Sequence, residues 1–217
     1  MDACGCGDGF EIFDQQSADA DLDRYRRHGP DRTTAMLLGM IRERGVEGAS
    51  VLDVGGGIGV IDHELLRAGA GYAVLVDASP PALAAARAEA RRRGVLERLE
   101  FVDGDFVSRS ASIDAADIVT LDRVVCCYPD VESLVHLSSS RARSVYGLVL
   151  PRDRLILRVG LRLLNIWFRL RGFRYRSFVH PNARVDAIVA GSGLRPAREE
   201  RTFVWRVVLY DRAAPPA

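Results

Sequence analysis

Acidic residues end several apolar runs of this chain, and the first of these runs leads into a glycine-rich turn. The segment reads Val51, Leu52, Asp53, Val54, Gly55, Gly56, Gly57, Ile58, Gly59. Glycines at positions 55, 57 and 59 let the backbone pass close to a bulky ligand, because they carry no Cβ atom. A second apolar run ends at Asp77, whose carboxylate can accept hydrogen bonds from two vicinal ribose hydroxyls. These residues predict a site for a nucleoside-containing cofactor.

The spacing of the glycines narrows the choice of cofactor. A dinucleotide fingerprint would need glycine at position 60, where this chain has Val60. The Gly-x-Gly-x-Gly turn instead resembles motif I of the class I S-adenosylmethionine (SAM) methyltransferases. By this resemblance SAM is the cofactor, and Asp105 accepts a hydrogen bond from its adenine amino group while Phe106 packs on the ring. The full set of cofactor residues that we expect is Asp53, Gly55, Gly56, Gly57, Gly59, Asp77, Ala78, Asp105, Phe106 and Leu121.

The segment from Asp122 to Tyr128 follows the fourth expected strand and should face the reactive methyl group. Ligands of parallel sheets bind beyond the carboxyl ends of the strands, where the strand order reverses. The segment lacks the Asp/Asn-Pro-Pro-aromatic motif with which methyltransferases hold exocyclic or amide nitrogens. We therefore expect a small, apolar acceptor that is methylated at oxygen, sulfur, carbon or another soft atom. Where that acceptor must lose a proton, the candidate catalytic residues are Tyr128, Asp122 and His180.

Alternating strand and helix patterns predict an α/β fold with a doubly wound, Rossmann-like sheet. The resemblance implies seven strands that end in a C-terminal antiparallel hairpin. We expect an N-terminal helical cap over residues 1–48, the SAM-binding domain over residues 49–212 and a tail over residues 213–217. Strands are expected at residues 51–54, 72–76, 99–102, 116–121 and 154–159, and the hairpin at 194–210. Helices are expected near residues 22–27 and 31–44, at 80–93 before Gly94, after Asp130, and at 183–190.

A basic and apolar insertion spans residues 160–180 and contains the run Gly160 to Arg171. As a helix, this run carries a wide apolar stripe, with its arginines projecting elsewhere. Such stripes usually pack on a sheet, and we expect that arrangement here. Two alternatives remain: a lid over a hydrophobic substrate, or a peripheral contact with a membrane surface. Both alternatives suit an apolar acceptor such as a porphyrin, a quinone or a lipid, and the general layout resembles that of magnesium-protoporphyrin O-methyltransferases.

Four cysteines occur as two pairs, Cys4 with Cys6 and Cys126 with Cys127. In the cytoplasm, where we expect this protein, they should be reduced. We expect no resident metal. An alternative hypothesis brings the four thiols together to hold zinc or a soft acceptor such as arsenic(III), which would make the protein a metalloid or thiol methyltransferase.

Composition limits the classes of function. The chain has 217 residues, 48% of them hydrophobic, which suits one domain with a full core. Thirty arginines, with no lysine, against 29 acidic residues give a net charge of +1, so no strong field recruits nucleic acid. We expect no nucleic-acid partner and no integral membrane segment. A non-catalytic module that binds SAM or a partner protein remains the alternative to an enzyme.

Overall fold

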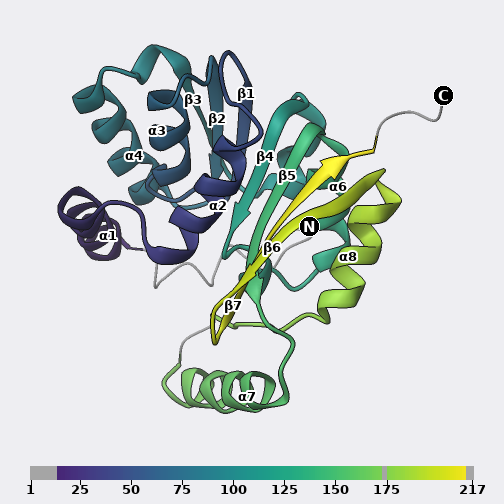
Figure 1. The fold of residues 1–217 in the computed structure, drawn as a ribbon. Coiled ribbons are helices and arrows are strands. Elements are labelled where there is room, and N and C mark those ends of the chain that lie inside the picture. The colour runs from purple at the N-terminus through teal and green to yellow at the C-terminus, as the bar shows by residue number, and fades with distance from the viewer. Residues whose placement is uncertain (1–13, 173–174, 214–217) are drawn as a thin grey trace.

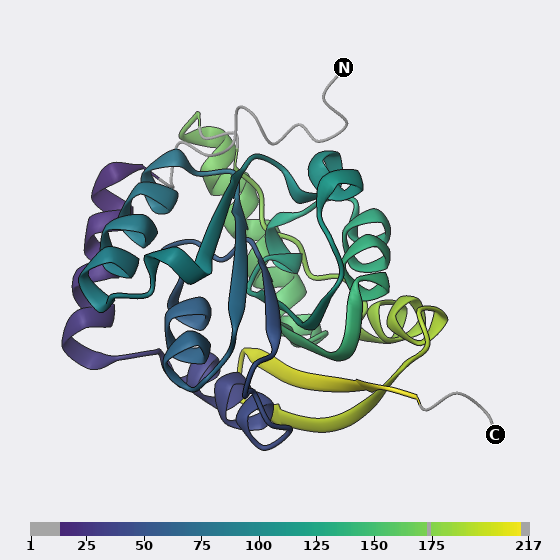
Figure 2. The same cartoon turned by 90° about the horizontal axis from the view of Figure 1, so that it is seen from above.

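A seven-stranded sheet forms the centre of the protein, with helices packed on both of its faces (Figure 1, Figure 2). The structure, a computed structural model, describes residues 14–172 and 175–213. The strands are β1 (Ser50–Val54), β2 (Tyr72–Asp77), β3 (Leu99–Asp103), β4 (Ala116–Asp122), β5 (Ala142–Pro151), β6 (Leu194–Arg201) and β7 (Trp205–Arg212). Their order is β3-β2-β1-β4-β5-β7-β6, and β7 runs antiparallel to β5 and β6 in an otherwise parallel sheet. The predicted doubly wound sheet with its C-terminal hairpin is confirmed.

Two apolar cores separate the sheet from its helices. The helices are α1 (Gln15–His28), α2 (Arg32–Arg42), α3 (Val60–Arg67), α4 (Pro80–Arg93), α5 (Phe106–Arg109), α6 (Val131–Ser140), α7 (Leu155–Leu170) and α8 (Asn182–Gly191). One core joins α2, α3 and α4 to the sheet, and the other joins α5, α6 and α8 to the opposite face. Helix α1 lies outside α4 and packs through a small third cluster that includes Tyr25 (Figure 1).

Local signals in the sequence set the ends of the helices near the strand tips. Ser79 caps α4 by accepting a hydrogen bond from the Ala82 amide, and Pro80 follows it. Gly94 ends the same helix with a φ of 72°, a left-handed conformation that glycine adopts without strain. Asp130 caps α6 through the Ser133 amide. Because helix starts lie so close to strand ends, the turns between them are short and hold their side chains at one edge of the sheet.

The predicted fifth strand at residues 154–159 is wrong. The fifth strand is β5, at Ala142–Pro151, and residues 155–170 form helix α7. Strand β5 is almost continuously apolar and lies between β4 and β7, so it is buried from both sides of the sheet. The short apolar run after Arg154 is compatible with both a strand and a helix. Only the helical spacing of the apolar residues that continue to Leu170 indicates a helix.

The expectation that the apolar stripe of residues 160–171 packs on the sheet is also wrong. Helix α7 has no buried residue and projects from the body of the protein on the connection between β5 and α8 (Figure 1). Leu155 and Leu170, at its two ends, are 76% and 80% exposed. Among the residues that the structure describes, none therefore buries the apolar face of this helix. In the described ranges, none of the helices is both long and apolar enough to cross a membrane.

Candidate functional site

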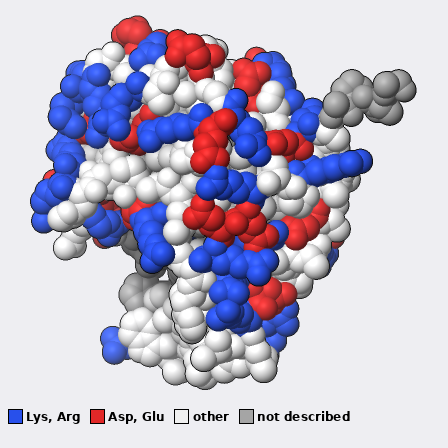
Figure 3. All heavy atoms as spheres, in the orientation of Figure 1, with Lys and Arg blue, Asp and Glu red and all other residues white. Residues whose placement is uncertain are grey.

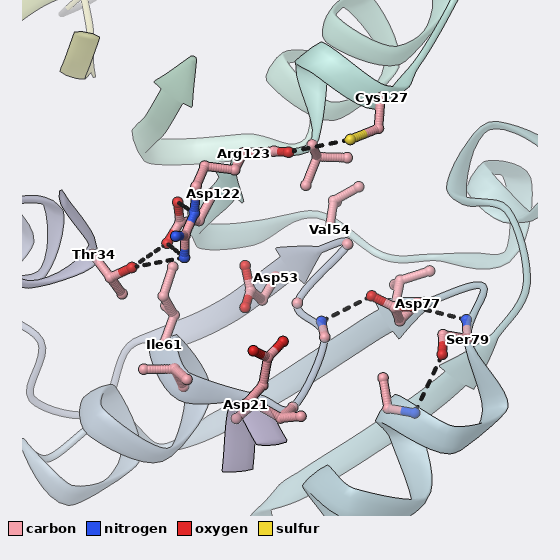
Figure 4. Close-up of a pocket in the computed structure, with 18 of the residues that line it drawn as sticks. Asp21, Thr34, Asp53, Val54, Ile61, Asp77, Ser79, Asp122, Arg123 and Cys127 are labelled. Carbon is pink, nitrogen blue, oxygen red and sulfur yellow. Dashed lines mark hydrogen bonds and ion pairs between the residues drawn. The ribbon is translucent and has the colours of Figure 1, made fainter. Parts of the chain in front are cut away.

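A cavity of about 450 Å³ lies at the carboxyl ends of β1, β2, β3 and β4 and is closed on one side by α1. It occupies the place where the strand order reverses, between β1 and β4. Its volume falls in the range of small-molecule and cofactor sites. The turns after these strands bring together most of the residues that the sequence analysis placed at the cofactor, and Figure 4 shows several of them around the cavity.

The glycine turn after β1 has one position that is open toward a ligand and two that are filled by the protein. A Cβ atom at Gly55 would lie 2.5 Å from the Val124 side chain, and one at Gly56 would lie 2.6 Å from a carboxylate oxygen of Asp53. At Gly57, with a φ of 56°, an added Cβ would meet no atom within 4 Å. Gly59 begins α3 with a φ of 75° and does not line the cavity. Gly57 is therefore the glycine beside which a ligand has room.

Asp77 holds this turn in place, and its carboxylate can accept further hydrogen bonds from a ligand. One of its carboxylate oxygens accepts a hydrogen bond from the Gly57 amide, and the other accepts one from the Ser79 amide, each at 2.8 Å. Burial raises the pKa of Asp77, although the amides of Ser79 and Gly57 oppose this rise. A carboxylate has about four acceptor positions, so two remain for the hydroxyls of a bound ribose. The residues present thus fit the nucleoside part of SAM.

Other predicted cofactor residues have different surroundings. Asp105 lines the cavity and caps α5 by accepting a hydrogen bond from the Ser108 amide at 3.0 Å. Phe106 is buried beside it, and Ala78 also lines the cavity. Leu121 is fully buried in the core of the sheet and is not part of the cavity wall. The structure therefore places Asp105, Phe106 and Ala78 at the cavity, whereas Leu121 lies in the core.

Beneath the glycine turn lies a pair of buried carboxyl groups. Asp53 accepts a hydrogen bond from the Thr120 hydroxyl at 2.6 Å, across the β1–β4 pair. Burial and the neighbouring Asp62 raise the pKa of Asp53, and burial raises the pKa of Asp62 to about 7. The hydrogen bond of Asp62 with Asp53 opposes this rise, and no other side chain of the described residues bonds the Asp62 carboxylate. The pair therefore retains a proton at a pH where ordinary carboxyl groups have lost theirs.

An ion-pair network joins the N-terminal helices to the tip of β4. Arg123 donates from Nε to Asp122 at 3.0 Å (Figure 4). It also pairs with Asp31, the residue that caps α2. The Thr34 hydroxyl donates to Asp122. Arg123 has a φ of 63°, which is uncommon for a residue other than glycine. The site residues predicted from the sequence did not include Asp31, Thr34 and Arg123, because their contacts depend on how α2 packs against β4.

The three candidate catalytic residues have different places. Asp122 lines the cavity, and burial raises its pKa while the Arg123 guanidinium opposes the rise. Tyr128 also lines the cavity, and burial together with Asp105 raises its pKa, so its hydroxyl stays protonated. His180 is outside the cavity wall, with Nε2 at 2.9 Å from the Tyr128 carbonyl oxygen and a pKa that burial lowers. Of the three, Asp122 is the one that brings a carboxylate to the cavity.

Two cysteines follow β4 at the far side of the cavity. The Sγ atoms of Cys126 and Cys127 lie 3.7 Å apart, and Cys127 Sγ is 3.0 Å from the Tyr175 hydroxyl. The hydrogen bond with the Cys126 thiol lowers the pKa of Cys127 to about 7. Cys4 and Cys6 are outside the described residues. Among residues 14–172 and 175–213, no group of three or more His, Cys, Asp or Glu side chains could hold a metal ion.

Comparisons with known proteins agree with this geometry. Residues 51–143 match the family model described as a methyltransferase domain. Over 72 residues the chain is 40% identical to the ribosomal protein L11 methyltransferase of Klebsiella pneumoniae (strain 342); the match covers 33% of this chain and 25% of that protein. The chain thus spans only about a quarter of the length of the curated relatives that it matches.

Solved structures extend the likeness to nearly the whole fold. Magnesium protoporphyrin IX methyltransferase from Synechocystis PCC 6803, with bound S-adenosylhomocysteine (SAH), superposes with a TM-score of 0.65 at 20% identity, covering 94% of this chain and 85% of that one. An O-methyltransferase family protein from Burkholderia thailandensis gives a TM-score of 0.71 at 18% identity, covering 94% and 63%. Residues 51–143 thus match a methyltransferase domain, and nearly the whole chain has the fold of SAM-dependent methyltransferases. The Synechocystis protein binds SAH, the demethylated product of SAM, which agrees with the cofactor that the glycine turn predicted.

Substitution of Gly57 tests whether the open space beside it belongs to the cofactor. We expect Gly57→Ala to weaken SAM binding by at least about tenfold, because the new methyl group would occupy that space. Gly94→Ala is the matched control: its φ is 72°, its added Cβ would also meet no atom within 4 Å, and it lies at the end of α4, away from the cavity. Both variants should lose about 1 kcal/mol of stability from backbone strain. Equal SAM affinities of the two variants by titration calorimetry would contradict this assignment.

Proposed function

We propose that this protein transfers the methyl group of SAM to an oxygen or another soft atom of a small, apolar molecule. The observation that carries the proposal is a single cavity that joins the glycine turn and Asp77 to the segment from Asp122 to Tyr128. Bound SAM would supply an activated methyl group on a sulfonium, open to in-line attack. Apolar side chains such as Val54, Ile58 and Val124 line the cavity, which favours an apolar acceptor. O-methyltransferases among the structural neighbours support oxygen as the attacked atom.

The residues of the chain have separate roles in this proposal. Asp77 and Gly57 hold the nucleoside end of SAM, with Asp105 and Phe106 at the adenine. Asp122 accepts the proton of an acceptor hydroxyl, because burial moves its pKa upward toward that of a useful base. Tyr128 remains protonated, so its hydroxyl can donate a hydrogen bond that orients the acceptor. We place His180 in a supporting position, behind the backbone of Tyr128.

The test combines binding with turnover. Calorimetry should detect SAM binding to the purified protein, and SAH release should be measured against a panel of apolar phenols, carboxylic acids and thiols. For an active hydroxyl acceptor, Asp122→Asn should lower kcat by at least about a hundredfold and leave the SAM dissociation constant unchanged. SAM binding without SAH release from any acceptor or from a cell extract would favour a non-catalytic SAM-binding module. Absence of SAM binding would overturn both functions.

A second candidate is methyl transfer to a soft acceptor held by thiols. It is favoured by one observation, the placement of Cys127 in the cavity wall with its pKa lowered to about 7 and Cys126 beside it. A thiol with this pKa is substantially thiolate at neutral pH and can bind a metalloid. Activity on arsenite that disappears in Cys127→Ser, with activity on hydroxyl acceptors absent, would establish this candidate in place of the first. Unchanged activity of Cys127→Ser on a hydroxyl acceptor would exclude it.

A further inference from the structure

Helix α7 turns its apolar face outward. Eight of the eleven large hydrophobic side chains that the described residues expose belong to this one helix: Leu155, Ile156, Val159, Leu163, Leu164, Ile166, Trp167 and Leu170. At about 100° per residue these eight side chains cover one half of the helix surface. The lower lobe of Figure 3, which α7 forms, is accordingly white over most of the face in view. A contiguous apolar surface of this kind marks an interaction site.

The opposite side of α7 holds the helix to the protein. The Asn165 side chain donates to the Ser177 carbonyl at 2.7 Å and accepts from the Ser177 amide at 2.9 Å. The Phe168 ring meets the ring of Tyr175 edge-on, with the centroids 5.7 Å apart. Tyr175 in turn lines the cofactor cavity. Contacts on its inner side thus orient α7, and its apolar face is exposed to solvent.

The tip of the β6–β7 hairpin continues this surface. Phe203 and Val204 are exposed there, and the Arg154 guanidinium at the start of α7 lies 5.5 Å from the centre of the Phe203 ring. In Figure 1 the hairpin tip points toward the end of the molecule that carries α7. The apolar surface therefore draws on two elements that are distant in sequence, which we call together the α7 face.

Only positive charge borders the α7 face along the helix. Arg162 and Arg169 are exposed at one edge of the apolar stripe, and Arg171 follows at its C-terminal end. From Arg154 to Arg184 the sequence contains no Asp or Glu. The remaining helix arginine, Arg158, pairs with Asp153 just before the helix. An outward apolar stripe with a tryptophan and an arginine rim is the pattern of a helix that lies flat in the interface of an anionic lipid bilayer.

We propose that the α7 face binds the surface of an anionic membrane, with α7 parallel to the plane of the bilayer. The helix is about 24 Å long and is too short to span the hydrocarbon core. Its leucines and Trp167 would enter the acyl boundary, while Arg162 and Arg169 meet lipid phosphates. A second copy of the chain fits this surface less well. A twofold contact between two α7 faces would bring their arginine rims together without an acidic partner on either helix.

Vesicle flotation with the full chain tests this proposal. The protein should float with vesicles of equimolar phosphatidylglycerol and phosphatidylcholine, and less with phosphatidylcholine alone. The double variant Leu163→Glu and Leu170→Glu should lower the partition coefficient on anionic vesicles by at least about tenfold. Because both positions are exposed, the variant should fold and retain SAM binding. Replacing Arg162 and Arg169 by Gln should cause at least about a tenfold loss on anionic vesicles and little on phosphatidylcholine.

The matched control carries the same charge change on other helices. Ala20→Glu with Ala84→Glu, exposed on α1 and α4, should leave flotation at the wild-type value. Failure of the wild type to float, or equal losses in both glutamate double variants, would overturn the proposal. So would a stable dimer in sedimentation that the Leu163→Glu and Leu170→Glu variant abolishes, since that result assigns the α7 face to a second copy. SAM binding and SAH release report on the proposed function separately from all these outcomes.

Discussion

Replacing Asp77 by Asn is expected to weaken SAM binding by at least about a hundredfold. The two carboxylate oxygens accept from the Gly57 and Ser79 amides at 2.8 Å. An asparagine would turn its NH₂ group toward one of these donors, which would displace the glycine turn. It would also remove the negative charge that two ribose hydroxyls would meet. Each hydrogen bond to a charged group contributes about 1.5–3 kcal/mol, so the loss of two exceeds a factor of a hundred.

Asp103→Asn is the matched control for this substitution. Asp103 is the neighbour of Asp77 in the pairing of β3 with β2, but it is exposed and does not line the cavity. Titration calorimetry with SAM and SAH should give wild-type affinities for Asp103→Asn. Denaturant unfolding of both variants separates loss of affinity from loss of fold. Wild-type affinity in Asp77→Asn would contradict the position of the ribose at the end of β2.

The positions of Asp77 and Gly57 could be predicted because they depend on the local sequence. An apolar run, a glycine spacing and a helix start such as Ser79–Pro80 each fix the chain within a few residues, and parallel strands then align their carboxyl ends. Asp105 and Phe106 reached the cavity for the same reason. Leu121 did not line it, since the alternation of side chains along a strand turns that residue into the core.

Contacts between distant segments could not be read from the sequence. The network of Asp31, Arg123 and Asp122 depends on how α2 docks, and nothing near Asp31 in the sequence indicates a partner 92 residues away. Helix α7 is a second example. The helical spacing of its apolar residues predicts an apolar face but not the surface that this face contacts, and the expectation that it packs on the sheet was wrong. The pairing of Asp53 with Asp62 likewise could not be predicted from the sequence, because it depends on how α3 packs against β1.

Those buried acids predict how stability responds to pH. Burial raises the pKa of Asp62 from an ordinary 3.8 to about 7. Between these two values the folded protein keeps a proton that the unfolded chain has released. The free energy of unfolding therefore includes a favourable contribution below about pH 4, which is lost as the pH rises through about 7. His63, beside Asp62 in sequence, has the opposite effect: burial lowers its pKa to about 4, so its contribution is lost as the pH falls.

The variant Asp62→Asn isolates the contribution of the carboxyl group, since that of His63 is common to both proteins. We expect the free energy of unfolding of the wild type to fall relative to that of the variant as the pH rises from about 4 to about 7, because only the wild type takes up a proton on folding in that range. Between about pH 5 and pH 8 the variant should gain at least about 1 kcal/mol of stability relative to the wild type, because it never has to bury an ionised carboxylate at this position. Urea unfolding across this range measures the difference, with Asp114→Asn, at an exposed position, as the control. A difference between Asp62→Asn and wild type that stays constant from about pH 5 to pH 8 would mean that Asp62 is already ionised in the folded protein, and that Asp53 alone holds the proton beneath the glycine turn.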